Sequence, residues 1–153
     1  MKHLKIIILI ILAAVFLTAC GSGSQTAVQG SGSTPELLVS SGDNSKSYTR
    51  ADLEALSASQ ASFNGVDYQG VTVSALLEAA GFDSAQMKAL KAVASDGFTV
   101  NYDPSQVLGD DIIIAYATVD GELTEEDGSF RMVLPGAEGK LNVRMLVELQ
   151  VVE

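Results

Sequence analysis

Apolar and polar positions follow two different periods along residues 35–153. Residues 73–80 have apolar side chains at i, i+3, i+4 and i+7 and are followed by Gly81, which predicts a helix that ends at a glycine. Thr49 and Asp52 are spaced as in a capping box and predict a second, short helix within residues 48–56. A single helical turn is expected at residues 104–108, after Asp103.

Strands are predicted where apolar and β-branched residues form short runs between turn signals. The run at 112–119 has an unbroken apolar start, which favours a central strand. Further strands are expected at 35–41, 89–95, 98–102, 130–134 and 143–152, with shorter extended pieces within 57–70. Turn pairs Asn64-Gly65, Asp96-Gly97 and Asp120-Gly121 separate several of them. This mixture predicts an α+β fold, with two short helices on a mostly β, mixed sheet or barrel.

The first twenty residues have the pattern of an export signal. Lys2 and Lys5 precede eleven apolar residues, 6–16, and the segment closes with Leu17-Thr18-Ala19-Cys20. Eleven residues at about 1.5 Å each span about half of a ~30 Å hydrocarbon core, which favours a cleaved signal over a membrane-spanning helix. The closing residues resemble the lipobox of bacterial lipoproteins. That resemblance implies a signal peptide at 1–19, a lipid on Cys20 and a location on the extracytoplasmic face of the cell membrane.

An ordinary signal peptide with a chance cysteine is the alternative. Residues 20–34 are rich in Gly and Ser and have no apolar periodicity, so a flexible tether is expected there. Residues 35–153 then form one domain.

The domain carries an unusual balance of ionisable groups. Apart from Lys2 and Lys5 it has seven basic and nineteen acidic residues, a net charge of −12, which disfavours nucleic acid as a partner. The only histidine is His3 and the only cysteine is Cys20. Cys/His zinc sites, Ser–His–Asp triads and haem held by His or Cys are therefore excluded for this domain. The acidic runs at 110–111 and 125–127 are expected to be solvated loops rather than metal sites.

Five short motifs follow one another in a fixed order. They are Gly70-Val71 with Leu76 to Gly81, Ser95 to Phe98, Ile112 to Tyr116 with Asp120 to Leu123, Phe130 to Gly136, and Gly139 with Val143-Arg144. In this order they resemble the oxidoreductase molybdopterin-binding domain, the fold of sulfite oxidase. Val73 stands for the family's Leu, Arg144 for its Lys and Met145 for its Trp. The resemblance implies a sulfite oxidase-like fold over most of residues 36–153.

The resemblance fails where the family binds its metal. Its enzymes ligate molybdenum through a cysteine in the segment that corresponds to Ser57–Gln69, which here contains Ser57, Ser59 and Ser62 but no cysteine. A thiolate is the soft ligand on which this chemistry relies. The histidine that commonly helps to hold the pterin is also missing. We therefore expect no catalytic residue and no molybdenum ligation, while the resemblance leaves molybdopterin as a candidate cofactor.

The candidate cofactor-binding residues lie in and near the loop 135–144. In the family, basic side chains and backbone N–H groups of this loop contact the pterin phosphate, which points to Arg131, Lys140, Asn142 and Arg144 here. Arg131 could instead pair with Asp127 or Glu138, and Arg144 could lie on a solvated face. The four tyrosines, Tyr48, Tyr68, Tyr102 and Tyr116, are expected at core edges with their hydroxyls outward.

Three functions are compatible with these motifs and this composition. The first is a non-catalytic ligand-binding or accessory module, whose small-molecule or protein partner the sequence does not identify. The second is a molybdopterin-dependent oxidoreductase without cysteine ligation of the metal. The third is an adhesion or assembly domain that uses the fold as a scaffold. The missing thiol favours the first.

Overall fold

The computed structural model describes residues 34–153, which form one compact unit. The predicted signal peptide, Cys20 and the tether up to Ser33 lie outside the described residues. Within 34–153, no helix is both long enough and apolar enough to cross a membrane.

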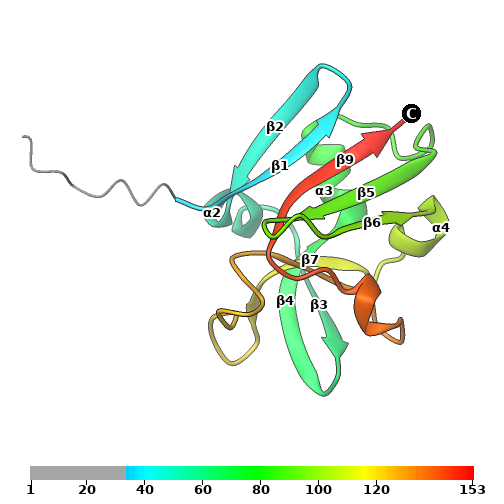
Figure 1. The fold of residues 1–153 in the computed structure, drawn as a ribbon. Coiled ribbons are helices and arrows are strands. Elements are labelled where there is room, and N and C mark those ends of the chain that lie inside the picture. The colour runs from blue at the N-terminus through cyan, green and yellow to red at the C-terminus, as the bar shows by residue number, and fades with distance from the viewer. Residues whose placement is uncertain (1–33) are drawn as a thin grey trace, which may run out of the picture. The chain divides into compact units, whose positions relative to one another are not determined.

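A five-stranded mixed sheet contains both ends of the domain (Figure 1). Its strands are β1 (Glu36–Ser41), β2 (Asn44–Thr49), β5 (Ala89–Ala94), β6 (Thr99–Tyr102) and β9 (Leu146–Val152), in the order β2-β1-β9-β5-β6. Only the β1–β9 pair is parallel, with Leu38 opposite Glu148. The last strand of the chain thus lies in the middle of the sheet, between two hairpins.

A four-stranded antiparallel sheet lies below it in Figure 1. Its strands are β3 (Ala58–Phe63), β4 (Val66–Thr72), β7 (Ile113–Thr118) and β8 (Arg131–Val133), in the order β3-β4-β7-β8. The register of β4 against β7 shifts at Gly70, where an added Cβ would come within 2.1 Å of the Ile114 carbonyl oxygen. Only glycine fits at this close approach of two backbones.

Helices α2 and α3 both follow a predicted pattern, and the start of α2 and the end of α3 lie at the predicted capping residues. Helix α2 (Arg50–Glu54) starts at a capping box formed by Thr49 and Asp52. Helix α3 (Val73–Ala80) ends at Gly81, which has a φ of 86°. One further turn, α4 (Pro104–Val107), follows Asp103, and a 3₁₀ turn spans Gly139–Leu141. The α+β class and the two short helices are confirmed.

Two hydrophobic clusters explain the apolar run of β7. Ile114 and Tyr116 belong to the main core, together with residues of α3 and the five-stranded sheet. Ile113 and Ala115 face the other way, into a smaller cluster with Tyr68. Both faces of β7 are covered, so the strand has no polar alternation, and its predicted place inside a sheet is confirmed.

The expectation for the tyrosines was wrong. All four are buried, and three of the hydroxyls have partners inside the protein. Tyr102 donates to the carbonyl oxygen of Leu141 over 2.6 Å, Tyr68 accepts from Arg131, and Tyr116 accepts from the Gln69 amide. The Tyr48 hydroxyl is buried and has no partner among the described residues. Strand β2, which carries Tyr48, was not predicted either.

Candidate functional site

Arg131 on β8 lies in the interior rather than in a binding loop. Its Nη1 donates to the Asp127 carboxylate over 2.6 Å and to the Tyr68 hydroxyl over 2.8 Å. The guanidinium also lies over the Tyr68 ring, 4.6 Å from its centroid, and 5.8 Å from that of Phe63. Only 3% of Arg131 is exposed. The pairing with Asp127 is therefore realised, and a bound phosphate would have no access to this guanidinium.

Asp127 is held in place by its own turn. Thr124 Oγ1 donates to Asp127 Oδ2 over 2.9 Å, and the Asp127 backbone N–H donates to the Thr124 carbonyl. The second oxygen, Oδ1, receives Arg131. Each oxygen of the buried carboxylate thus has a partner, as a buried charge requires. The Arg131–Asp127 pair is therefore a buried ion pair that connects β8 to the preceding turn and stabilises the fold, an internal strut in this sense.

Asn142 fixes the shape of the loop 134–142. Its Oδ1 accepts from the Leu134 backbone N–H over 2.7 Å, and its Nδ2 donates to the carbonyls of Leu134 and Glu138, each over 3.3 Å. The side chain is 3% exposed. The contacts described for both atoms of the amide are with backbone groups of the loop.

Lys140 and Arg144 are exposed, and each is paired with a carboxylate. Lys140 Nζ lies 2.8 Å from Glu138, which raises the pKa of Lys140 and lowers that of Glu138 through the hydrogen bond they share. Arg144 Nη1 lies 2.9 Å from Glu126, and its Nε lies 3.8 Å from Asp127. A phosphate would have to displace or approach these acids, which weakens the electrostatic attraction on which phosphate binding depends.

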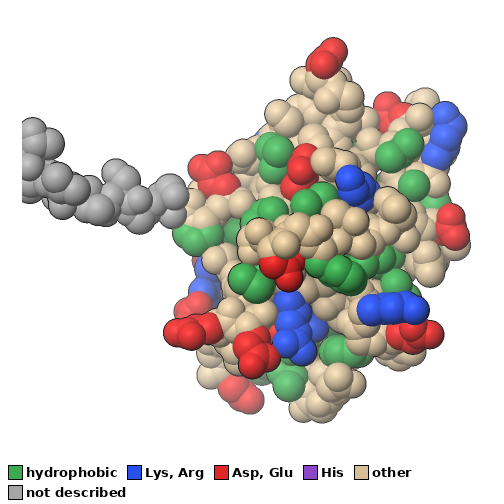
Figure 2. Space-filling view, viewed as in Figure 1, with side chains coloured by type: hydrophobic (Ala, Val, Ile, Leu, Met, Phe, Trp, Pro, Cys, Tyr) green, Lys and Arg blue, Asp and Glu red, His purple; other side chains and the backbone are tan. Residues whose placement is uncertain are grey.

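Three of the four candidate residues share one groove. Lys140, Asn142 and Arg144 line a hollow of about 540 Å³ together with Phe98 and Met145, whereas Arg131 is not among its lining residues. Asn142 contributes only a wall, since its amide is used within the loop. Figure 2 shows hydrophobic side chains on this face of the molecule with acidic and basic side chains close beside them.

Two further hollows were not predicted from the sequence. One, of about 560 Å³, is lined by Arg50, Tyr116, Glu122, Glu125 and Phe130 among others. The other, of about 330 Å³, lies between Glu36, Phe130, Met145 and Val147. Their lining comes from seven separate parts of the chain, 34–36, 50, 95, 116, 122–125, 128–130 and 145–147, and no local sequence pattern brings those parts together.

Arg50, at the start of α2, is neutralised within the first of these hollows. It donates to Glu54 over 2.7 Å and to Glu122, and these bonds raise the pKa of Arg50, with the Glu54 bond the largest cause. Its guanidinium lies 5.8 Å from the centroid of the Tyr116 ring. The cation thus joins α2 to the 122–125 segment.

Met145 is the residue in the least favourable backbone conformation on this surface. Its φ is 50°, which is uncommon for a residue other than Gly, Asn or Asp. The Met145 N–H donates to the Asp127 carbonyl over 2.7 Å, and its own carbonyl accepts from the Ser95 N–H over 2.9 Å. These bonds hold the backbone, while the side chain is 38% exposed.

The segment that corresponds, by resemblance, to the one carrying the family's metal ligand is a closed hairpin here. Strands β3 and β4 pair continuously from Ala58 opposite Val71 to Phe63 opposite Val66. Asn64 and Gly65 both have positive φ, as the tightest hairpin turns require. Ser62 donates to Asp67 across this hairpin. Residues 34–153 contain no group of three or more His, Cys, Asp or Glu side chains that could hold a metal ion.

The residues present do not fit the molybdenum cofactor that the resemblance implies. The domain offers no thiolate for the metal. Of the basic side chains proposed for the phosphate, Arg131 is buried against Asp127, and Lys140 and Arg144 are paired with Glu138 and Glu126. We therefore derive no reaction step through that cofactor.

Comparison with known proteins supports the fold assignment. The structure is similar to the sulfane dehydrogenase SoxCD from Paracoccus pantotrophus, with a TM-score of 0.65 and 22% sequence identity. The match covers 77% of this chain but only 38% of the SoxCD chain, so this chain corresponds to a minor part of that protein. The comparison with curated proteins gives no match.

A profile of the oxidoreductase molybdopterin-binding domain matches residues 33–153, which include every described strand and helix. The motifs, the sulfite oxidase-like fold and this match agree. The chain belongs to the oxidoreductase molybdopterin-binding domain family.

Proposed function

We propose that this chain is a membrane-anchored, extracytoplasmic lipoprotein whose molybdopterin-binding-like domain is a non-catalytic ligand-binding or accessory module. The observation that carries the proposal is the buried Arg131–Asp127 pair. In it a cation at a family motif position is fully engaged by the protein's own carboxylate and an aromatic ring. The β3–β4 hairpin adds to this, because it closes the segment in which the family places its thiolate.

Metal analysis tests the non-catalytic part of the proposal. The full chain would be purified from a host that makes molybdopterin, with an authentic molybdenum enzyme of the family from the same cells as the control for cofactor supply. We expect molybdenum and pterin to be far below one per chain, while the control enzyme is loaded. Stoichiometric molybdenum in this chain would overturn the proposal and favour the oxidoreductase.

Metabolic labelling tests the anchor. Cells fed a radioactive fatty acid are expected to label the protein, and the label should disappear in Cys20→Ser, which removes the thiol that would carry the lipid. Ser22→Ala, two residues further on, is the matched control and should keep the label. Fractionation should place the wild type with membranes and Cys20→Ser elsewhere. A wild-type protein without label would contradict the lipoprotein assignment.

A further inference from the structure

The three hollows described above adjoin one another through shared lining residues. The 560 Å³ hollow and the 330 Å³ hollow share Pro35, Gly128, Ser129 and Phe130, and Met145 lines both the 330 Å³ hollow and the 540 Å³ hollow. They form one elongated surface feature, which we call the trough. It runs from Arg50 past Phe130 and Met145 to Phe98. A feature of three hollows in a row suits an extended chain with side chains at intervals better than it suits one small molecule.

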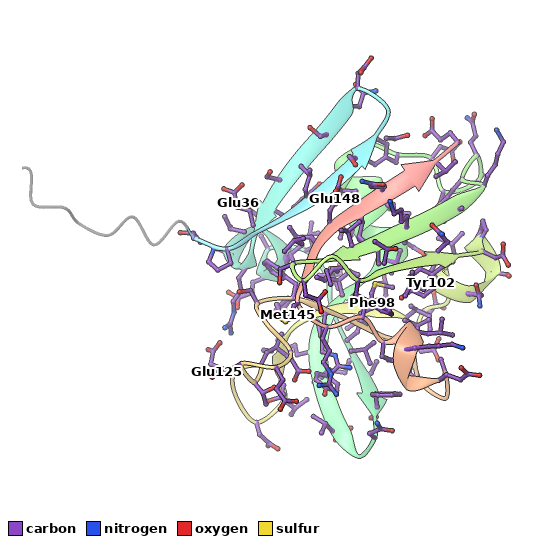
Figure 3. All side chains as sticks on the ribbon, viewed as in Figure 1. Glu36, Phe98, Tyr102, Glu125, Met145 and Glu148 are labelled. Carbon is purple, nitrogen blue, oxygen red and sulfur yellow. The ribbon has the colours of Figure 1, made fainter. Side chains whose placement is uncertain are left out.

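Exposed apolar side chains line the trough from its centre to its Phe98 end. Phe98, Met145 and Val147 are 47%, 38% and 38% exposed, and they are half of the six large hydrophobic residues that are exposed in residues 34–153. Phe98 and Met145 line the same hollow, and in Figure 3 they lie at the centre of the view, where the β5–β6 turn meets the segment entering β9. An apolar surface gathered in this way marks a binding site.

Met145 stands where two hollows meet, and its strained backbone supports the same reading. The hydrogen bonds to Asp127 and Ser95 hold it at positive φ with its side chain outward. Unfavourable backbone conformations that the surrounding structure enforces are concentrated at functional sites. Methionine is also a flexible side chain that adapts to different apolar partners.

The rim of the trough is acidic. Its lining includes Glu36, Asp96, Glu122, Glu125 and Glu126, against the cations Arg50, Lys140 and Arg144. Each of these cations already pairs with a carboxylate. Glu36, Asp96 and Glu125 have no salt bridge within residues 34–153, and Figure 3 shows Glu36 and Glu125 toward the same side of the view. The field along the trough therefore attracts cations.

We infer that the trough binds an extended basic peptide segment of a protein partner, in which apolar side chains alternate with Lys or Arg. The apolar side chains would occupy the hollows beside Phe98 and Met145, and the basic ones would reach Glu36, Asp96 and Glu125. A second copy of this chain fits less well, because two domains of net charge −12 repel each other. Residues 21–33 of this chain also fit less well as the occupant, because they contain no Lys or Arg that could pair with the acidic rim. This inference rests on the proposed function and names its partner class.

Binding is measured with three labelled synthetic peptides and the full chain in detergent, by fluorescence anisotropy. The peptides have the same apolar residues and a proline that keeps them extended, with Lys, Gln or Glu at the alternate positions. We expect the Lys peptide to bind at least about tenfold more tightly than the Gln peptide, and the Glu peptide not to bind. Raising the salt from about 0.05 M to about 0.5 M should remove most of the Lys advantage, because salt screens exposed charges.

Matched variants locate the site. Met145→Asn removes the apolar side chain but suits positive φ, so the fold is kept, and we expect binding to weaken by about tenfold. Phe98→Ser is the second variant and should also weaken peptide binding. Val66→Ser removes a similarly exposed apolar side chain at the start of β4 and should leave peptide binding unchanged. The double variant Glu36→Gln with Glu125→Gln should weaken binding of the Lys peptide only. Glu78→Gln on α3 is the control for the loss of a carboxylate outside the trough.

The outcomes separate this inference from the proposed function. Equal binding of all three peptides, no binding at all, or full binding by folded Met145→Asn and Phe98→Ser would overturn the trough as a basic-peptide site. A wild-type dimer that Met145→Asn dissociates would overturn it as well, in favour of a second copy. Each of these results leaves the metal analysis unchanged, whereas stoichiometric molybdenum would overturn the proposed function itself.

Discussion

Arg131 and Arg144 both contact Asp127, yet they occupy opposite environments. The side chain of Arg131 is 4% exposed and lies 2.6 Å from the carboxylate, whereas that of Arg144 is 54% exposed and lies 3.8 Å away. Arg131 also has Tyr68 and Phe63 against its guanidinium, while Arg144 has only the exposed Glu126 as a close ionic partner. Two cations of one sequence cluster have thus been separated into an interior strut and a surface charge.

The difference shows that basic residues close together in a sequence do not need to share one site or one role. A charge that is taken out of water must be paired, so Arg131 and Asp127 depend on each other. A charge in water gains little from its partner and stays available for other contacts. Buried polar groups should therefore cost stability when they are removed, and exposed charges should not.

Removing the buried cation is expected to have the largest effect. Arg131→Met leaves the buried Asp127 carboxylate without its close cationic partner, which should lower the free energy of unfolding by about 3–5 kcal/mol in urea titrations. The double variant Arg131→Met with Asp127→Asn removes both charges and should recover a good part of this loss. An Arg131→Met protein as stable as the wild type would show that the pair is not a strut.

Asn142→Ala is expected to cause the second largest loss of stability. It leaves the Leu134 N–H and two carbonyls without their side-chain partner in a buried place, a cost of about 1–3 kcal/mol. Urea titration measures it, with Asn101→Ala on the exposed face of β6 as the control. If Asn142→Ala weakened ligand binding without loss of stability, its amide would belong to the site and not to the loop.

Tyr102→Phe should cost about 0.5–1.5 kcal/mol at neutral pH through the lost bond to Leu141. Burial raises the pKa of the Tyr102 hydroxyl above its ordinary value of 10.0, so the folded protein keeps a proton that the unfolded chain releases. The contribution of Tyr102 is therefore complete below pH 10.0 and falls above it, by about 1.4 kcal/mol per pH unit. Unfolding of both proteins between neutral and alkaline pH checks this: the advantage of the wild type should narrow only above pH 10.0.

The smallest effect is expected at the surface. Arg144→Gln and Lys140→Gln each break an exposed ion pair and should leave the free energy of unfolding almost unchanged, with a still smaller effect at high salt. Thermal unfolding at two salt concentrations measures this. A loss as large as that of Arg131→Met would erase the distinction between the two arginines.

Elements with a regular period or a capping signal could be predicted, and elements defined by distant neighbours could not. Helix α3 needs only its own apolar spacing and Gly81, and its bounds match the prediction. Strand β2 reads Asn-Ser-Lys-Ser-Tyr-Thr and forms the exposed edge of its sheet, where Tyr48 is its only buried residue. An edge strand with one solvated face gives little alternation to detect.

The same limit applies to the candidate site. The sequence places Arg131 within a motif, but its burial depends on Tyr68 and Phe63 in a hairpin more than sixty residues earlier. The prediction that the tyrosine hydroxyls point outward was wrong for a similar reason. The Leu141 carbonyl that accepts the Tyr102 hydroxyl lies on a loop far along the chain. Asn142 was found as a candidate, yet its role in the loop could only be seen in the structure.

The position of β9 also sets the order in which the domain can be completed. The β1–β2 and β5–β6 hairpins form from neighbouring residues, but they join into one sheet only through β9, which follows all the other described strands in the sequence. Pairing Leu38 with Glu148 closes a very long loop, and such non-local contacts form slowly. A chain in which residues 146–152 have not yet paired therefore lacks the centre of its sheet, and its two hairpins stay separate until β9 is in place.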